Sequence, residues 1–165
     1  MRIKLLTLLL LCLVLTSCSS GAELCPLDDY SVRYNENAED FGFKKISLST
    51  SDSGVCGFAA FDGLFIVCLC VTEEGYIYSA DISTGSEYSK LISQDETEFE
   101  KALLSAAYLV SPLYLEEPSE EDISKIAGMI LAALKEAKTV TPQKGMSLSG
   151  KMTSNGGFEF EVNLV

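Results

Sequence analysis

The sequence predicts an α+β fold, with an antiparallel sheet of about five to six strands and two helices packed on one face. Three observations support this class. Residues 43–83 contain short extended segments separated by tight turns, residues 93–138 carry two helical stripes of apolar side chains, and residues 146–164 alternate between apolar and polar positions. Strands, then two helices, then strands favour one sheet with the helices on one side. We expect residues 43–165 to form this single domain.

The first half of the domain is expected to form four strands. The segments are residues 44–50, 55–61, 64–72 and 76–83. Asp62-Gly63 is a strong signal for a two-residue hairpin turn, and Glu73-Glu74-Gly75 fits a loop with glycine at the left-handed position. Residues 64–71 are apolar on both faces, so this strand is expected at the centre of the sheet, covered above and below.

Two amphipathic helices are expected next. Ser93 to Glu96 has the form of a capping box, and Pro112 ends the first helix. Ser119 is the expected N-cap of the second helix, and Lys135 and Lys138 suit its C-terminal end. The apolar positions with helical spacing are Phe99, Ala102, Leu103, Ala106, Ala107 and Val110, then Ile123, Ile126, Ala127, Ile130, Ala133, Leu134 and Ala137. Both stripes are typical of helices that pack on a core.

The last two predicted strands form a hairpin with one apolar and one polar face. The apolar side chains are Met146, Leu148, Met152, Phe158, Phe160, Val162 and Leu164. Because only one face is apolar, the sheet is expected to be covered on one side only at this end. The polar side chains of the uncovered face form the candidate interaction surface: Ser147, Ser149, Lys151, Glu159 and Glu161.

A short hydrophobic segment precedes the domain. Arg2 and Lys4 are followed by an apolar run over residues 5–15, too short for a bilayer core that needs roughly 20 apolar residues. This pattern is typical of an export signal. Leu15-Thr16-Ser17-Cys18 closes the run and resembles the lipobox of bacterial lipoproteins. The resemblance covers residues 1–18 and implies a signal peptide over residues 1–17 and a diacylglyceryl group on the thiol of Cys18.

The resemblance also implies a location. Lipid on Cys18, usually with a further acyl chain such as palmitate, would anchor the exported protein in a membrane. That membrane is the cytoplasmic membrane, at its outer leaflet, in a one-membrane bacterium, or the outer membrane in a two-membrane one. Residues 18–42 are expected to form the lipidated cysteine and a flexible tether of about 25 Å. Ordinary secretion, with cleavage after Ala22, is the alternative.

Composition argues against several classes of function. The formal net charge is −12, which disfavours nucleic acid as a partner. The chain has no histidine, which is the commonest general base and metal ligand. It also lacks a Gly-x-Ser-x-Gly elbow, a Walker loop and a dinucleotide fingerprint, so we expect no cofactor and no metal. Asp81 is the one acid inside a predicted strand with apolar neighbours, and a solvated edge position is expected for it.

Four cysteines follow the lipobox: Cys25, Cys56, Cys68 and Cys70. Counting back from the predicted two-residue turn places Cys56 opposite Leu69, so its side chain faces away from Cys68 and Cys70. Cys68 and Cys70 share a face, with Cα atoms about 6.6 Å apart, at the edge of disulfide reach. We therefore expect buried free thiols. Cys25, on the expected tether, would be available for a bridge between chains.

The sequence is compatible with three functions. The first is a non-catalytic interaction or binding module of the cell envelope, with an envelope protein as partner. The second is a carboxylate-dependent envelope hydrolase, which requires two carboxyl groups in one cleft. The third is a carrier of a small hydrophobic ligand, which requires a cavity between helices and sheet where the alanines leave room.

Overall fold

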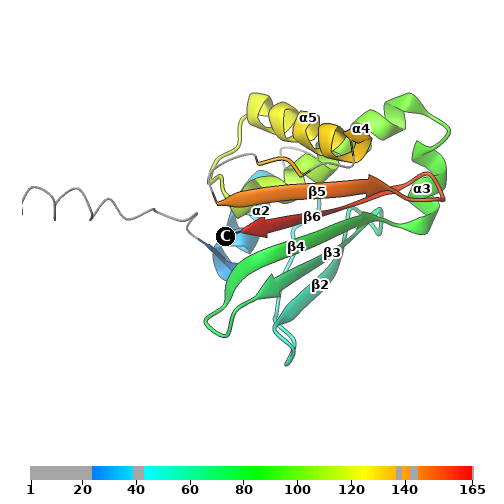
Figure 1. Ribbon diagram of the computed structural model, residues 1–165. Helices are drawn as coiled ribbons and strands as arrows, with labels where there is room; N and C mark the ends of the chain where they lie inside the picture. The colour runs from blue at the N-terminus through cyan, green and yellow to red at the C-terminus, as the bar shows by residue number, and fades with distance from the viewer. Residues whose placement is uncertain (1–23, 39–42, 137–138, 142–144, 165) are drawn as a thin grey trace, which may run out of the picture.

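The computed structural model describes residues 24–38, 43–136, 139–141 and 145–164. These residues form an antiparallel sheet with helices packed on one face, which confirms the predicted α+β class (Figure 1). The expected signal peptide and the lipobox with Cys18 lie outside the described residues.

The described residues form a six-stranded sheet with the order β2-β3-β4-β6-β5 and a short β1 beside β4. The strands are β1 (Cys25–Pro26), β2 (Val55–Ala60), β3 (Phe65–Val71), β4 (Tyr76–Thr84), β5 (Met146–Met152) and β6 (Phe158–Leu164). All neighbouring pairs are antiparallel. The chain leaves the sheet after β4, passes through the helices and returns through β5 and β6, so the closing hairpin lies beside β4.

The β2–β3 hairpin has the predicted register, with Cys56 opposite Leu69. The strands end at Ala60 and Phe65, so the connection is longer than the predicted two-residue turn. Phe61 has a positive φ of 52°, which is rare for a bulky residue. Its ring packs on Phe43 and Phe65, with centroids 4.1 and 5.7 Å apart, and these contacts hold the strained residue in place.

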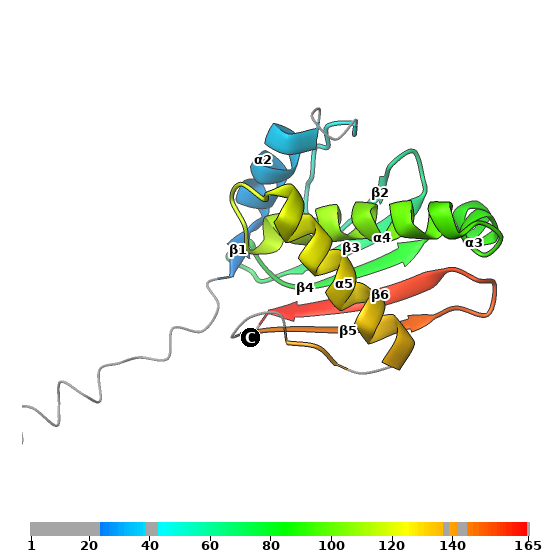
Figure 2. The same ribbon diagram turned by 90° about the horizontal axis from the view of Figure 1, so that it is seen from above.

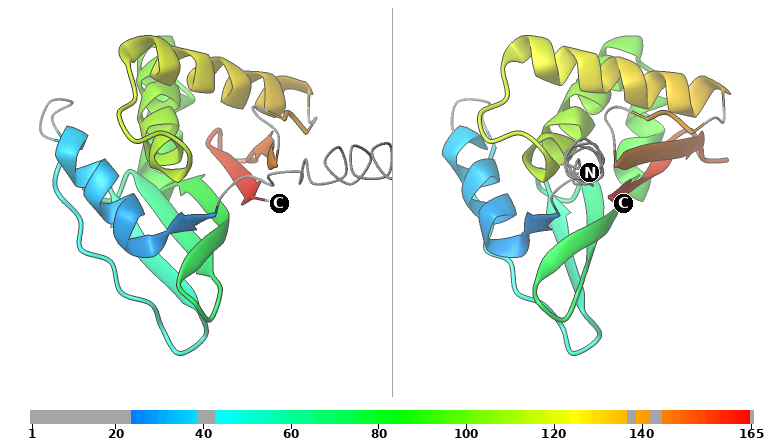
Figure 3. Two further views of the ribbon diagram at one scale, coloured as in Figure 1. Left: turned by 90° about the vertical axis from the view of Figure 1, so that its left-hand side faces the viewer. Right: turned by 60° about the vertical axis from the view of Figure 1, so that its left-hand side comes forward.

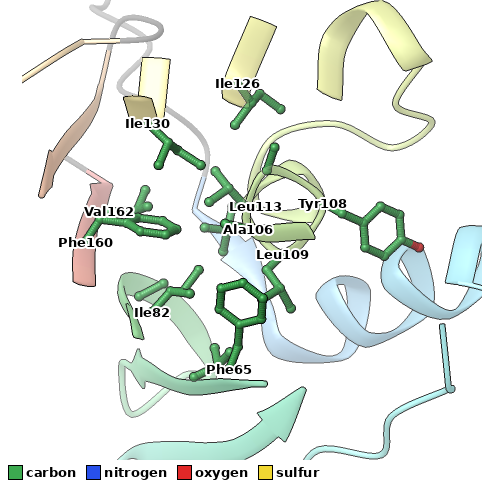
Figure 4. Packing of buried hydrophobic residues seen from close by; sticks show 14 of the residues in the cluster. Phe65, Ile82, Ala106, Tyr108, Leu109, Leu113, Ile126, Ile130, Phe160 and Val162 are labelled. Carbon is green, nitrogen blue, oxygen red and sulfur yellow. The ribbon is translucent and has the colours of Figure 1, made fainter. Parts of the chain in front are cut away.

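Helices α4 (Glu96–Val110) and α5 (Glu120–Glu136) cover one face of the sheet and cross each other above it (Figure 2). We call this the inner face and the opposite side the outer face. The described residues of both predicted stripes contribute to the core, which is seen from close by in Figure 4, while Ala137 and Lys138 lie outside the described residues. Core side chains shown there are Phe65, Ile82, Ala106, Leu109, Leu113, Ile126, Ile130, Phe160 and Val162. No helix within the described ranges is long and apolar enough to cross a bilayer.

The ends of these helices partly follow the prediction. Ser119 is the N-cap region of α5 as expected: its Oγ accepts the N–H of Asp122 at 3.2 Å, and the Asp122 carboxylate accepts the N–H of Ser119 at 3.1 Å. The predicted capping box at Ser93 is wrong, because Ser93 ends a separate short helix, α3 (Ser86–Ile92). Helix α4 is capped instead by Asp95, whose side chain accepts the N–H of Thr97 at 2.8 Å.

The expected flexible tether is wrong over residues 24–38. These residues form β1 and helix α2 (Leu27–Ala38), with Tyr30, Tyr34 and Ala38 fully buried. The three apolar positions are spaced at i, i+4 and i+8, a narrow stripe inside an otherwise polar sequence. Hydrogen bonds strengthen the contact, because Tyr30 Oη donates to the Leu109 carbonyl at 2.9 Å.

Cys25 is buried with this segment, at 2 % exposure, so the expected availability for a bridge between chains is wrong. Burial raises the pKa of its thiol to about 11.

Residues 44–50 were expected to form a strand and do not. Ile46 and Leu48 nevertheless pack against the core while their neighbours are exposed, so the predicted alternation holds. The Asn35 side chain of α2 bonds both peptide groups of Ile46, accepting from its N–H at 2.7 Å and donating to its carbonyl at 2.8 Å. A side chain of α2 thus takes the place of a strand partner.

Figure 3 shows the sheet from its end, with the described helices on the inner side. The expectation that β3 is covered on both faces is therefore wrong. Ile66 is 53 % exposed, and Cys68 and Cys70 are half-buried, all on the outer face of β3. These three residues are apolar although no second layer of described residues covers the outer face of β3.

Candidate functional site

The outer face is an open surface whose side chains are aligned in rows by the strand register. Reading from β2 through β3, β4 and β6 to β5, the rows are Val55, Cys70, Ser79, Asn163 and Ser147; Gly57, Cys68, Asp81, Glu161 and Ser149; and Ala59, Ile66, Ser83, Glu159 and Lys151. All five residues of the candidate interaction surface lie in these rows. They sit together on β5 and β6, as the alternation predicted.

The half of the outer face on β4, β6 and β5 is polar and acidic; we call it the acidic half. It surrounds a hollow of about 410 Å³ that is open to solvent. The polar side chains that line the hollow are Asp81, Ser83, Ser149, Lys151, Glu159 and Glu161. Lys151 forms an ion pair with Glu159, its direct neighbour across the strands. The hydrogen bond and the charge of Glu159 raise the pKa of Lys151.

Asp81 lies within this cluster, between Cys68 of β3 and Glu161 of β6. Asp81 is exposed, as expected, but the expected edge position is wrong, because β4 is an inner strand of the sheet. Partial burial raises the pKa of the Asp81 carboxyl, and the charges of Glu161 and Glu159 raise it further. Within the described ranges, neither Asp81 nor Glu161 forms an ion pair with a lysine or arginine. The acidic half therefore carries carboxylates that repel each other.

The other half of the outer face, on β2 and β3, is uncharged; we call it the apolar half. Its side chains belong to Val55, Ala59, Ile66, Cys68 and Cys70. Tyr76 and Tyr78 at the start of β4 are also exposed, at 41 % and 46 %. Ile66, Cys68 and Cys70 were not predicted to belong to the site because β3 was expected to be covered on both faces. The spacing of Tyr76 and Tyr78 predicts that both lie on one face of their strand, and the structure exposes both.

The described cysteines are free. Cys56 is buried on the inner face, opposite Leu69, so the prediction that it faces away from Cys68 and Cys70 is confirmed. The expected burial of Cys68 and Cys70 is only partial. Partial burial and the charge of Asp81 raise the pKa of the Cys70 thiol, against the opposing effect of a hydrogen bond from Tyr78. Cys70 is therefore a weak nucleophile at neutral pH.

In the part of the chain that the structure describes, no three cysteine, aspartate or glutamate side chains are placed to hold a metal ion. Two carboxyl groups do lie side by side, because Asp81 and Glu161 are direct cross-strand neighbours. Their position on an open sheet face leaves both accessible.

A second hollow, of about 490 Å³, lies along α4 and α5 beside Phe43. Its apolar lining comes from Phe43, Leu104, Tyr108 and Ile123. This is not the place that the carrier hypothesis requires. Three alanines of α4, Ala102, Ala106 and Ala107, are fully buried and mark close packing.

Comparisons of this chain with protein-family models, with curated proteins and with solved structures found no match.

Proposed function

We propose that this chain is an exported lipoprotein, anchored through Cys18, whose domain is a non-catalytic interaction module of the cell envelope. The partner is another envelope protein, and the outer face of the sheet binds it. The observation that carries the proposal is this open face, where an apolar half and an acidic half lie side by side on one rigid sheet. The resemblance of Leu15-Thr16-Ser17-Cys18 to a lipobox supports the anchor.

The short distance along the chain between Cys18 and the domain supports a position close to the membrane. The described fold begins at Leu24 and β1 begins at Cys25. The chain from Cys18 to Leu24 reaches at most about 20 Å, even when fully extended. A lipid on Cys18 would therefore hold the sheet beside the membrane surface, where another envelope protein is within reach.

The chemistry of the outer face specifies the kind of partner surface. Protein interfaces combine a desolvated apolar centre with complementary charges that set orientation. Here Ile66 and Ala59 offer the apolar contact, while Asp81 and Glu161 offer negative charge that no described cation neutralises. The matching surface presents apolar side chains next to lysines or arginines.

Charge reversal on this face tests the proposal. The tagged full chain is cross-linked in native membranes, and the captured proteins are compared between Glu161→Lys and a matched control, Glu100→Lys. Glu100 is exposed on α4, on the helical side of the molecule. We expect Glu161→Lys to lose a partner that the native chain and Glu100→Lys both capture. Equal capture by both variants would contradict binding through the outer face.

The anchor is tested separately. We expect Cys18→Ala to move the protein from the membrane fraction to soluble or unprocessed material, because the diacylglyceryl group has no thiol to join. Unchanged membrane partitioning together with normal cleavage would contradict the proposal that the chain is a lipoprotein.

A second candidate is carboxylate-dependent hydrolysis of an envelope glycan. It is favoured by the adjacent carboxyls of Asp81 and Glu161, one of which has a raised pKa, at the edge of a hollow. It ranks second because the hollow is open, whereas catalytic clefts usually enclose their ligand. This candidate would become the first if the native chain released reducing sugar from envelope glycans and both Asp81→Asn and Glu161→Gln abolished that release.

A further inference from the structure

The two edges of the sheet are protected to different degrees. At the β5 edge, Val140 bridges Leu148 with two hydrogen bonds of 2.8 Å, and Lys151 adds a charge. At the other edge, β2 consists of six uncharged residues, without proline and without a bulge in its register with β3 (Figure 1). Charge, proline, bulges and a covering loop are among the devices that keep edge strands from pairing with other chains. β2 has no charge, proline or bulge, and among the described residues the segment before it bonds the outward peptide groups of β2 only at Val55, through the N–H of Ser51.

Two hydrogen bonds show which peptide groups of β2 point outward. The Gly54 carbonyl accepts the N–H of Val71 on β3 at 2.8 Å. Every second residue of β2 therefore directs its backbone N–H and C=O groups toward β3, namely Cys56, Phe58 and Ala60. The Val55 carbonyl points the other way and accepts the N–H of Ser51 at 3.0 Å. The alternation then directs the N–H and C=O groups of Gly57 and Ala59 away from the sheet.

Gly57 and Ala59 are both exposed. Among the described residues, no backbone or side-chain group bonds their outward peptide groups. Two alternate residues of one edge strand thus offer two donors and two acceptors at the spacing of a strand ladder.

We propose that β2 pairs with β2 of a second copy of this chain. The pairing is antiparallel about a two-fold axis at Phe58, so Gly57 of each copy lies opposite Ala59 of the other. Each of these two facing pairs exchanges two hydrogen bonds, about four in all, and every open group of both residues is used. The same patch serves both copies, which is the geometry of a closed dimer.

The distribution of charge favours a second copy over a different extended partner. The chain has a net charge of −12, so two copies repel each other at most orientations. β2 and the outer positions of β3 carry no charge, and the unpaired acids Asp81 and Glu161 lie beyond them toward the far edge. Asp62, in the turn at one end of β2, is paired with Lys44. A basic peptide would be drawn to the acidic half instead.

Pairing at this edge also joins the two outer faces. The apolar halves of both copies, with Ile66 exposed at 53 %, then form one central strip flanked by the two acidic halves. Because only one strand pair is buried, the dimer is of the weak class and depends on protein concentration. The inference concerns self-association and does not depend on the proposed envelope partner.

The test is sedimentation equilibrium of the full chain in density-matched detergent over a wide range of protein concentration. We expect the native chain to shift from monomer to dimer mass as concentration rises. Ala59→Pro removes only an outward N–H, since the ladder to β3 uses Cys56 and Phe58, and it should stay monomeric. Ala59→Ser keeps the N–H and should dimerise like the native chain.

A native chain that stays monomeric at every concentration would overturn the proposal, as would a dimer that Ala59→Pro leaves intact. Circular dichroism checks that Ala59→Pro is folded. Should it unfold, Ala59→Lys provides the second variant, because it leaves the backbone unchanged and places a repelling charge at the edge. A dimer of Ala59→Lys as stable as the native one would equally contradict pairing at β2.

Discussion

At the scale of single residues, Asp81 shows that neighbouring carboxylates on the open sheet face repel one another and oppose folding. The pKa of its carboxyl is raised by partial burial and then by Glu161 and Glu159. The folded state therefore holds a proton on Asp81 more tightly than the unfolded chain does. This contribution opposes folding at neutral pH, and it fades as the pH falls through the raised pKa toward the usual value for aspartate.

We expect Asp81→Asn to increase the free energy of unfolding at neutral pH, by less than about 1 kcal/mol because the side chain is solvent-exposed. Denaturant titrations of both chains should show this gain shrinking as the pH approaches 4, near the usual pKa of about 3.9 for aspartate.

Asp122→Asn serves as a control that should show the opposite pH dependence. Hydrogen bonds from Ser119 lower the pKa of Asp122, so its carboxylate favours folding at neutral pH and loses that effect in acid. A gain from Asp81→Asn that is independent of pH would contradict the electrostatic explanation.

At the scale of elements, α2 is held by buried tyrosines and belongs to the fold. Tyr30 is completely buried, and its hydroxyl donates to the Leu109 carbonyl at 2.9 Å. The Tyr108 hydroxyl of α4 donates back to the Tyr34 carbonyl at 2.7 Å. These two bonds cross between α2 and α4 in opposite directions and fix how α2 packs beside the sheet.

We expect Tyr30→Ala to lower the free energy of unfolding by about 3–5 kcal/mol, the usual cost of removing a buried aromatic side chain. Val32→Ala, on the exposed side of the same helix at 53 %, should change it by less than about 0.5 kcal/mol. Thermal and denaturant unfolding measure both variants. Equal, small effects would show that α2 is not docked in solution.

The start of β6 is linked to α3 through hydrogen bonds of Thr84, at a place where the backbone of the closing hairpin comes very close to α3. Thr84 Oγ1 accepts the N–H of Phe158 at 3.0 Å and lies 2.9 Å from Ser89 Oγ. A Cβ added to Gly157 would overlap both of these side-chain oxygens. Glycine at this position lets the backbone approach closely enough for the bonds to form.

We expect Gly157→Ala to destabilise the fold by about 1–3 kcal/mol, the usual cost of overpacking. The matched control is Gly128→Ala in α5, where an added Cβ meets nothing within 4 Å. That change should stabilise by about 0.5–1 kcal/mol, because alanine is the better helix former. If both variants were equally stable, the close contact at Gly157 would be absent in solution.

At the scale of the whole molecule, local patterns predicted most elements, and long-range packing decided the rest. The register that sets Cys56 opposite Leu69 follows from counting along one hairpin, so the sequence could predict it. Whether Ile66 is covered depends on which face the helices occupy, and β3 is apolar on both faces. The polar residues of α2 outnumber its stripe of Tyr30, Tyr34 and Ala38, so a distant contact with α4 decides that segment.

The same distinction applies to the candidate site. Alternation in the last hairpin was enough to place Ser149 and Glu161 together, because both lie within one hairpin. Asp81 joins them only because β6 returns to pair with β4 after the helical segment. A strand pairing across that distance in the chain leaves no local signal, so the acidic half was only partly predictable.

Site-specific photo-cross-linking in native membranes tests whether the outer face binds an envelope protein. A photoreactive residue is placed at Ser149, in the row with Asp81 and Glu161, and in a second chain at Glu100 on α4. We predict one discrete adduct from Ser149 and none from Glu100. An adduct from Glu100 alone, or no adduct from Ser149, would contradict binding through the outer face.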